Sequence, residues 1–375
     1  MELSVVILNY NVRYFLEQCI RSVQAAIANI DAEIIVIDNA SPDNSRQMVQ
    51  QRFPEILFIQ NSENVGFSKA NNQAVKKARG KYICILNPDT AVSEDTFLKA
   101  LKYYKSVKEI GALGVKLIDG TGKFLPESKR NLPTPFSSLL KLIGVGGKYY
   151  AEHLTQNETG EVEILVGAFM LVEKSIYEKV GGFDEDYFMY GEDIDLSYKF
   201  IKAGYKNHYL GNTVVLHYKG ESTKKDETYF DRFYGAMQIF YRKHYNPNFL
   251  FEKIVSLGVT LAKWKSRKMP KGIKEGEKEV KNYYLVSDNQ DLKKKLEEQI
   301  GKPFDFLTSE VLQVENSLIV FDAEFREYHK IFDSMQTLSE KGNLFRIKPL
   351  DADFILGSDT SDEKGVVIRF PKNLV

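Results

Sequence analysis

The stretch that decides the fold is Tyr82-Ile83-Cys84-Ile85-Leu86-Asn87-Pro88-Asp89-Thr90. Its first five residues form an apolar run that is typical of a buried strand. Asp89 follows shortly after the end of that run. In open α/β sheets, ligands bind at the carboxyl ends of the strands. The stretch therefore predicts a carboxylate at the ligand-binding edge of a sheet.

Strand-like and helix-like patterns alternate through the first 120 residues. The predicted strands are 3–8, 33–38, 56–60, 82–86 and 112–118, and the predicted helices are 13–28, one that starts near residue 42, 69–78 and 94–107. Strands that alternate with helices form parallel βαβ units with right-handed crossovers. We therefore predict an α/β fold with a doubly wound, Rossmann-like, mostly parallel sheet and flanking helices.

The pattern changes after residue 120. Prolines and glycines cluster between residues 120 and 160, and a long irregular insertion of this kind is typical of a functional flap. Order returns with an apolar stretch over 162–172, a helix from 174, a helix that ends near 203 and a strand over 212–217. A lysine- and glycine-rich stretch follows, and residues 282–375 then show a second, smaller α/β pattern.

The composition excludes several classes of protein. Fifty-one basic residues balance fifty-one acidic residues in a chain of 375, so no overall field favours nucleic acid as a partner. Cys19 and Cys84 lie in apolar segments without metal-type spacing, as in a reduced protein. We find no signal peptide and no apolar run of the roughly 18 residues that a membrane span requires. We therefore expect a cytoplasmic protein.

One amphipathic segment has two interpretations. Residues 249–264 are apolar on one face and run into a lysine-rich tail. A basic amphipathic helix can lie in a membrane interface. It can equally pack on its own domain and leave the tail in solvent. Peripheral contact with a membrane therefore remains one of two expectations.

Polar loops follow the predicted strands at one edge of the sheet. They are Asn9-Tyr10-Asn11, Asp38-Asn39-Ala40-Ser41 and the segment 61–67. An ionised Asp38 only accepts hydrogen bonds, so it suits the N–H and O–H groups of a nucleobase or ribose. The alternative role of Asp38 is to cap the helix near residue 42, and Ser41 already serves that purpose.

Two sequence patterns indicate the binding of a phosphate group and of a metal ion. Gly66 and neighbouring polar residues start a predicted helix, where backbone N–H groups favour anions, although an ordinary glycine turn gives the same pattern. Asp89 suits Mg²⁺ or Mn²⁺, which commonly combine one or two carboxylates with substrate phosphates. The alternative for Asp89 is an aspartate that only stabilises a turn.

A separate acidic cluster, Gly191-Glu192-Asp193-Ile194-Asp195, opens another predicted helix. A carboxylate at this point could act as a base in chemistry on a phosphorylated substrate. Acidic residues are also favourable at any helix N-terminus. The cluster alone does not distinguish these two roles.

Taken in order, these motifs resemble the inverting family 2 glycosyltransferases of the GT-A fold, especially the rhamnosyltransferase-like branch. The resemblance covers about residues 1–245. It is carried by Val5-Val6-Ile7-Leu8-Asn9-Tyr10-Asn11, Val36-Ile37-Asp38-Asn39-Ala40-Ser41, Asn64-Val65-Gly66-Phe67 with Asn71-Asn72, Leu86-Asn87-Pro88-Asp89, Gly181-Gly182-Phe183-Asp184, Tyr190-Gly191-Glu192-Asp193-Ile194-Asp195-Leu196, and His217 with Gly220 and Ser222.

The resemblance implies roles for the matching residues. Asp38 would bind the base of a nucleotide diphosphate sugar, Asp89 would hold a divalent cation, Mg²⁺ or Mn²⁺, and His217 would complete the metal or diphosphate site. The other implied substrate-binding residues are Asn9, Tyr10, Asn11, Asn39, Asn64, Gly66, Phe67, Asn71 and Asn87. The metal motif of the family is usually Asp-x-Asp, and here the neutral Asn87 stands at its first position.

Asp193 matches the general base of the family, and Glu192 is the next candidate. An acceptor hydroxyl attacks the anomeric carbon opposite the departing nucleoside diphosphate, and its proton must leave as the bond forms. A single displacement inverts the configuration and needs no nucleophile from the enzyme. Asp195 is expected to cap or orient the helix instead.

The resemblance thus implies an inverting, metal-dependent transfer of a sugar, with rhamnose as a candidate, during surface polysaccharide or glycan assembly. The donor would be a UDP- or dTDP-sugar, and the acceptor a hydroxyl of a glycan or lipid-linked molecule, at the inner face of the plasma membrane. One alternative is a non-catalytic sugar-nucleotide-binding or scaffold protein. Another is a nucleotidyltransferase, which normally needs a glycine- and basic-rich phosphate loop that Asn9-Tyr10-Asn11-Val12 does not provide.

The expected domains follow from this interpretation. We predict a GT-A domain over 1–264, with a nucleotide-binding half 1–120, an acceptor and catalytic half 160–245 and an amphipathic helix 246–264. A linker 265–281 would connect it to a small α/β domain, 282–375, whose role the sequence does not indicate.

Overall fold

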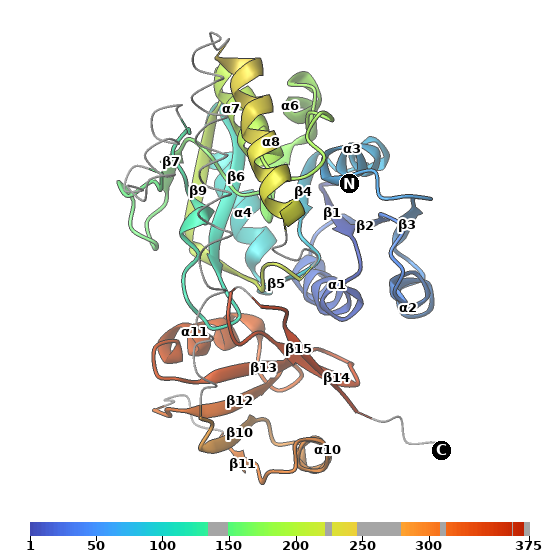
Figure 1. The fold of residues 1–375 in the computed structure, drawn as a ribbon, viewed down its shortest axis with the longest axis vertical. Helices are drawn as coiled ribbons and strands as arrows, with labels where there is room; N and C mark the ends of the chain where they lie inside the picture. Colours follow the sequence, from blue (N-terminus) through green and yellow to red (C-terminus); the bar gives the residue numbers. More distant parts are fainter. Residues whose placement is uncertain (134–148, 222–226, 246–278, 308–312, 362, 371–375) are drawn as a thin grey trace.

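The computed structural model describes residues 1–133, 149–221, 227–245, 279–307, 313–361 and 363–370. Within these residues, one sheet of nine strands and one of six form the framework. The larger sheet is built from the N-terminal two thirds of the chain, and the smaller from the C-terminal part (Figure 1).

The larger sheet has the order β3-β2-β1-β4-β8-β6-β9-β5, with β7 paired to β9. Six of its strands run in one direction, and β5, β7 and β8 run against them. Its strands are β1 (Leu3–Asn9), β2 (Ala32–Asp38), β3 (Leu57–Gln60), β4 (Tyr82–Leu86), β5 (Thr90–Val92), β6 (Ile110–Ile118), β7 (Gly160–Val162), β8 (Phe169–Glu173) and β9 (Lys206–His217). The predicted fold class, α/β with a mostly parallel sheet, is confirmed.

Helices cover both faces of this sheet. One hydrophobic cluster joins the sheet to α1, α2 and α4, and another joins it to α3, α6 and α7. All residues of β1 and β4 are therefore buried, which explains why both strands are continuous apolar runs. The helices are α1 (Arg13–Ile27), α2 (Ser45–Arg52), α3 (Phe67–Lys77), α4 (Thr96–Ser106), α6 (Lys174–Lys179), α7 (Glu192–Lys202) and α8 (Glu227–His244).

Antiparallel strands are the main difference from the sequence-based expectation. The apolar stretch 162–172 is divided between β7 and β8, and β5 was not predicted. β8 lies between β4 and β6 and runs against both, so the sheet is not doubly wound throughout. The local pattern could not indicate this, because the pairing depends on strands distant in sequence.

The insertion after residue 120 is partly ordered. It contains a 3-10 turn, Pro126–Ser128, and the backbone of Arg130 pairs with Tyr150 and Ile164. Pro135 and the glycines 144, 146 and 147, on which the predicted flap partly rested, lie outside the described residues. So do Ser222, the predicted amphipathic helix 246–264 and most of the predicted linker.

The smaller sheet has the order β11-β10-β12-β13-β14-β15. Its elements are β10 (Asn282–Val286), α10 (Gln290–Ile300), β11 (Asp305–Phe306), β12 (Ser317–Asp322), α11 (Tyr328–Leu338), β13 (Leu344–Lys348), β14 (Phe354–Gly357) and β15 (Val366–Arg369). The predicted small C-terminal α/β domain is thus confirmed, and the exact domain boundaries stay a prediction. In the described parts of both domains, no helix combines the length and apolar character needed to cross a membrane.

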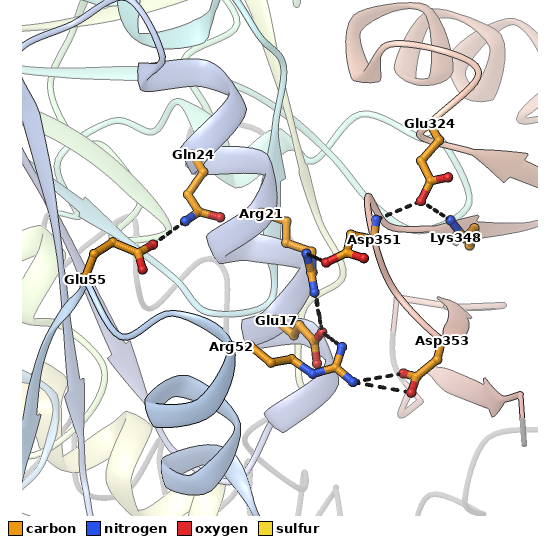
Figure 2. Close-up of polar contacts among 9 residues, drawn as sticks. All are labelled: Glu17, Arg21, Gln24, Arg52, Glu55, Glu324, Lys348, Asp351 and Asp353. Atoms are coloured by element: carbon orange, nitrogen blue, oxygen red, sulfur yellow. Dashed lines mark hydrogen bonds and ion pairs between the residues drawn. The ribbon is translucent and has the colours of Figure 1, made fainter. Parts of the chain in front are cut away.

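The two domains share a hydrophobic cluster and a polar network. Phe15 and Tyr218 of the larger domain pack in one cluster with Phe332 of α11. Figure 2 shows the polar network, in which the buried Glu17 accepts hydrogen bonds from Arg52 at 2.6 Å and Arg21 at 3.1 Å. The same two arginines pair with aspartates of the smaller domain, Asp351 at 3.1 Å and Asp353 at 3.3 Å. The C-terminal domain is therefore packed directly against the larger one.

Candidate active site

A cavity of about 290 Å³ opens at the carboxyl edge of the larger sheet. Residues from the strand-end loops and from the start of α7 line it together. Among the fourteen site residues expected from the sequence, nine belong to this lining: Tyr10, Asn39, Asn64, Phe67, Asn87, Asp89, Glu192, Asp193 and His217. The loops after β1, β2 and β4 thus reach one space with the acidic cluster.

Asp38 lies behind this lining. It is 1% exposed, and its carboxylate accepts hydrogen bonds from Asn9 Nδ2 at 2.8 Å and Gln60 Nε2 at 2.8 Å. Ser41 donates to it through its backbone N–H at 2.9 Å and its hydroxyl at 2.5 Å. Asn11 also contacts Ser41 through its backbone N–H. In this structure, Asp38 therefore holds the ends of β1, β2 and β3 together.

A second network fixes the loop before α3. The Asn39 side-chain amide donates to the carbonyl of Gly66 at 3.1 Å, and Asn64 Oδ1 accepts from the Gly66 N–H at 3.0 Å. Gly66 has a φ of 87°, and a Cβ there would lie 2.7 Å from the carbonyl oxygen of Phe188. A side chain at this position would therefore displace the segment before α7. Asn71 is buried in α3 and bonds the carbonyl of Phe67, so it supports the lining from behind.

Asp89 and His217 converge at one side of the cavity. Asp89 Oδ1 lies 3.4 Å from His217 Nε2, and the Asn87 side-chain nitrogen lies at the same distance from that nitrogen. The antiparallel pairing of β5 with β9, which sets Thr90 opposite His217, brings them together. Carboxylate oxygen and imidazole nitrogen are both suitable ligands for Mn²⁺.

The side chains of Asp89 and His217 fit a metal site whose ligands would come partly from the protein and partly from the substrate. Among the described residues, no group of three histidine, cysteine or acidic side chains converges closely enough to hold an ion. The buried His217 Nδ1 has no hydrogen-bond partner among them. A cation held by these two side chains would take its other ligands from water and substrate phosphates, a common arrangement for such cations.

Glu192 and Asp193 enter the cavity from the first turn of α7. Gly191 precedes them with a φ of 79°, where a Cβ would lie 3.1 Å from Ala236. Asp193 Oδ2 accepts from Arg130 Nη2 at 2.7 Å and from the Gly167 N–H at 3.2 Å. Burial, together with the charge of Asp193, raises the pKa of Glu192 to about 8. The two neighbouring carboxylates therefore have different environments.

Asp195 points away from this pair. It is fully buried, and its Oδ1 lies 2.6 Å from His244 Nε2 and 3.4 Å from the Tyr187 hydroxyl. These contacts tie α7 to α8. Asp195 thus orients the helix, as its spacing from Asp193 predicts.

Several lining residues were not found by sequence reasoning. Lys219 follows His217, and Ser361 comes from the C-terminal domain. The Ser361 hydroxyl donates to Asp119, and the Gly365 N–H donates to Glu221 at 2.6 Å. Burial raises the pKa of Glu221 to about 7. The C-terminal domain therefore reaches the rim of the cavity, which no local pattern in residues 282–375 indicated.

Comparison with known proteins now decides the family. Residues 4–181 match the family described as glycosyl transferase family 2. The N-acetylglucosaminyl-diphospho-decaprenol L-rhamnosyltransferase of Mycobacterium tuberculosis is 28% identical over 246 residues, which cover 60% of this chain and 78% of that protein. Residues 4–181 therefore form a glycosyl transferase family 2 domain. Its predicted family and enzyme class are thereby confirmed.

Other proteins resemble the glycosyltransferase as well. The rhamnosyltransferase WbbL of Escherichia coli K12 is 29% identical over 209 residues, covering 52% of this chain and 78% of WbbL. Among solved structures, the mannosyltransferase PcManGT from Pyrobaculum calidifontis, in complex with GDP-Man and Mn²⁺, superposes with a TM-score of 0.46 and 18% identity. That match covers 72% of this chain and 76% of PcManGT.

Proposed function

We propose that the glycosyltransferase moves a sugar, with inversion at the anomeric carbon, from a UDP- or dTDP-sugar to the hydroxyl of a glycan or lipid-linked acceptor. The observation that carries this proposal is the shared cavity, which has the Asp89–His217 pair on one side and the Glu192–Asp193 pair on another. Such an arrangement provides a place for a diphosphate and a separate base for the acceptor. Rhamnose is the candidate sugar, because two relatives are named as rhamnosyltransferases.

Asp193 is the proposed base. The acceptor oxygen bonds to the anomeric carbon while the bond from that carbon to the diphosphate oxygen breaks. The hydroxyl proton passes to the Asp193 carboxylate, and the bonding pair leaves with the nucleoside diphosphate. Because the attack and departure occur in one step, no covalent enzyme intermediate is needed.

Asp89 and His217 are the proposed protein ligands of Mg²⁺ or Mn²⁺. When bound, the ion stabilises the negative charge that grows on the leaving diphosphate. Asn87 lies beside His217 and adds a neutral amide to the site. Within the Asn87-Pro88-Asp89 motif, Asp89 carries the single negative charge.

The nucleotide would bind where Tyr10, Asn39 and Phe67 line the cavity. Tyr10 and Phe67 offer aromatic surfaces for the base, and Asn39 offers an amide. The predicted contact between Asp38 and the base stays a prediction. The hydrogen bonds of Asp38 support a further role for it, which is to fix the loops that carry these residues.

We expect nucleotide binding to depend on divalent metal. UDP and dTDP should bind more tightly with Mn²⁺ or Mg²⁺ than with EDTA, because a diphosphate brought to Asp89 without a cation meets like charge. Isothermal titration calorimetry measures all three conditions. Equal affinities would remove the proposed metal role. Asn87→Asp should tighten Mn²⁺ binding if Asn87 faces the ion, and unchanged affinity would exclude that contact.

The relatives and one segment of sequence support the proposed acceptor and location. The Mycobacterium tuberculosis relative is named for an acceptor on a polyprenyl diphosphate, and such acceptors reside in membranes. The sequence of residues 249–264 is amphipathic and is followed by a lysine-rich tail, and both lie outside the described residues. These features support the proposal of an enzyme at the cytoplasmic face of the membrane.

We expect the full chain to sediment with liposomes that contain anionic lipid at low salt. Each basic residue near the surface contributes about 1 kcal/mol of attraction, which salt weakens. A variant with Lys263, Lys265, Arg267 and Lys268 changed to glutamine should lose this preference. Equal sedimentation of the wild type with neutral and anionic liposomes would contradict the membrane contact.

A further inference from the structure

Arg130 contacts one of the two neighbouring carboxylates of the cavity. Its Nη2 donates to Asp193 Oδ2 at 2.7 Å, and the same oxygen accepts the Gly167 N–H at 3.2 Å. The side chains of Arg130 and Asp193 are only 8% and 12% exposed. Within the described part of the chain, the buried Glu192 Oε2 has no hydrogen-bond partner. The two carboxylates therefore differ in their partners as well as in their position.

The guanidinium of Arg130 is held in place by the segment that lines the cavity. The same Nη2 donates to the carbonyl oxygen of Leu165 at 2.7 Å. The backbone of Arg130 exchanges two hydrogen bonds with Ile164, at 2.9 and 3.0 Å. Ile164 and Leu165 are fully buried. Arg130 thus reaches Asp193 from a fixed support, as a preorganised site requires.

We propose that Arg130 is the positioning residue that makes Asp193, rather than Glu192, the base of the transfer. The inference rests on the proposed function, because it presumes a base that accepts a proton from the acceptor. An opposite charge in contact favours the ionised form of a carboxyl group, whereas burial without a partner favours the neutral form. Only an ionised carboxylate can take up the proton.

The contacts also orient the two oxygens of Asp193. Arg130 and Gly167 both bond Oδ2. Oδ1 accepts the N–H of Ile194 at 2.8 Å, which occupies one of its two lone pairs. The remaining lone pair of Oδ1 is then available to the acceptor hydroxyl. Arg130 acts on the reaction through Asp193 and does not itself need to touch the substrate.

The test compares Arg130→Gln, Asp193→Asn and the double variant. The assay measures nucleoside diphosphate release from dTDP-rhamnose, UDP-glucose and UDP-N-acetylglucosamine with a polyprenyl-diphosphate-linked N-acetylglucosamine as acceptor. Arg130→Gln should lower kcat by roughly ten- to a hundredfold, the cost of losing a charge-assisted hydrogen bond. The donor KM should change by no more than about twofold, because the interaction serves the chemical step. The double variant should be no slower than Asp193→Asn, since residues that act through one another are not additive.

Two further variants keep the result interpretable. Arg130→Gln leaves a buried carboxylate unpaired, which can destabilise the fold, so Arg130→Lys retains the charge and should recover part of the lost rate. Lys129→Gln is the matched control, because Lys129 is a buried neighbour whose Nζ bonds the carbonyls of Ala151 and Leu154 at 2.6 and 2.7 Å. Thermal unfolding of each variant defines a temperature at which all are folded.

The outcomes separate the inference from the proposed function. The role of Arg130 would be overturned if the Arg130→Gln enzyme kept the wild-type kcat. It would also be overturned if the double variant were slower than Asp193→Asn by the full factor seen for Arg130→Gln alone. Should Arg130→Gln not fold, Arg130→Lys and the double variant decide in the same way. Native turnover of Asp193→Asn would instead overturn the proposed base itself.

Discussion

Asp193→Asn should lower the turnover of sugar transfer by about 10²- to 10⁴-fold, the usual contribution of a general base. The substitution keeps the size of the side chain and removes its ability to accept the proton. Donor affinity should remain largely intact, because Asp193 acts on the acceptor. Initial rates at saturating donor and acceptor measure turnover, and calorimetry measures donor binding.

Asp186→Asn is the control for this experiment. Asp186 lies on the loop before α7, its side chain is 69% exposed, and it pairs with Lys243 at the surface. Changing it should leave turnover within about twofold, because surface ion pairs contribute little. If Asp193→Asn kept near-native turnover while folded, the base would have to be reassigned, with Glu192 next.

Asp89→Asn should lower kcat/KM by about a hundredfold or more. The substitution removes the carboxylate from the pair formed with His217, and a catalytic ion is worth several kcal/mol to the transition state. Part of the rate should return at high Mn²⁺ concentration, since the ion is then bound more weakly rather than excluded. Steady-state rates across a Mn²⁺ titration provide the measurement.

The Asp38→Ala variant is the control for this Mn²⁺ titration. Asp38→Ala should weaken donor binding without changing the Mn²⁺ concentration needed for half-maximal rate, because Asp38 lies behind the loops and not beside His217. An Asp89→Asn enzyme with the wild-type Mn²⁺ dependence would show that Asp89 does not hold the ion.

Much of the fold could be predicted because its signals are local. The apolar run 82–86 and the alternation of strands and helices depend on residues close in sequence, and β1 to β4 formed where they were expected. The position of Asp89 after β4 followed from the same pattern. The pairing of β5 with β9, which brings Asp89 to His217, is a contact across more than a hundred residues and left no local signal.

The missed residues have the same physical explanation. Arg130 lies in a proline-rich segment without periodicity, and its partner Asp193 is 63 residues away. Ser361 reaches the cavity only because the C-terminal domain packs against the larger sheet. Asp38 was expected to face the nucleotide, and the sequence could not reveal that Asn9, Ser41 and Gln60 surround its carboxylate.

The anomeric configuration of the product tests the proposed mechanism most directly. In the proposed mechanism Asp193 acts as a base and no covalent enzyme intermediate forms, so the acceptor oxygen attacks from the face opposite the nucleoside diphosphate. Proton NMR of the purified product, compared with the donor, reads this configuration from the coupling constants and chemical shift of the anomeric position. We expect inversion, and a product that retains the configuration of the donor would contradict direct displacement with Asp193 as the base.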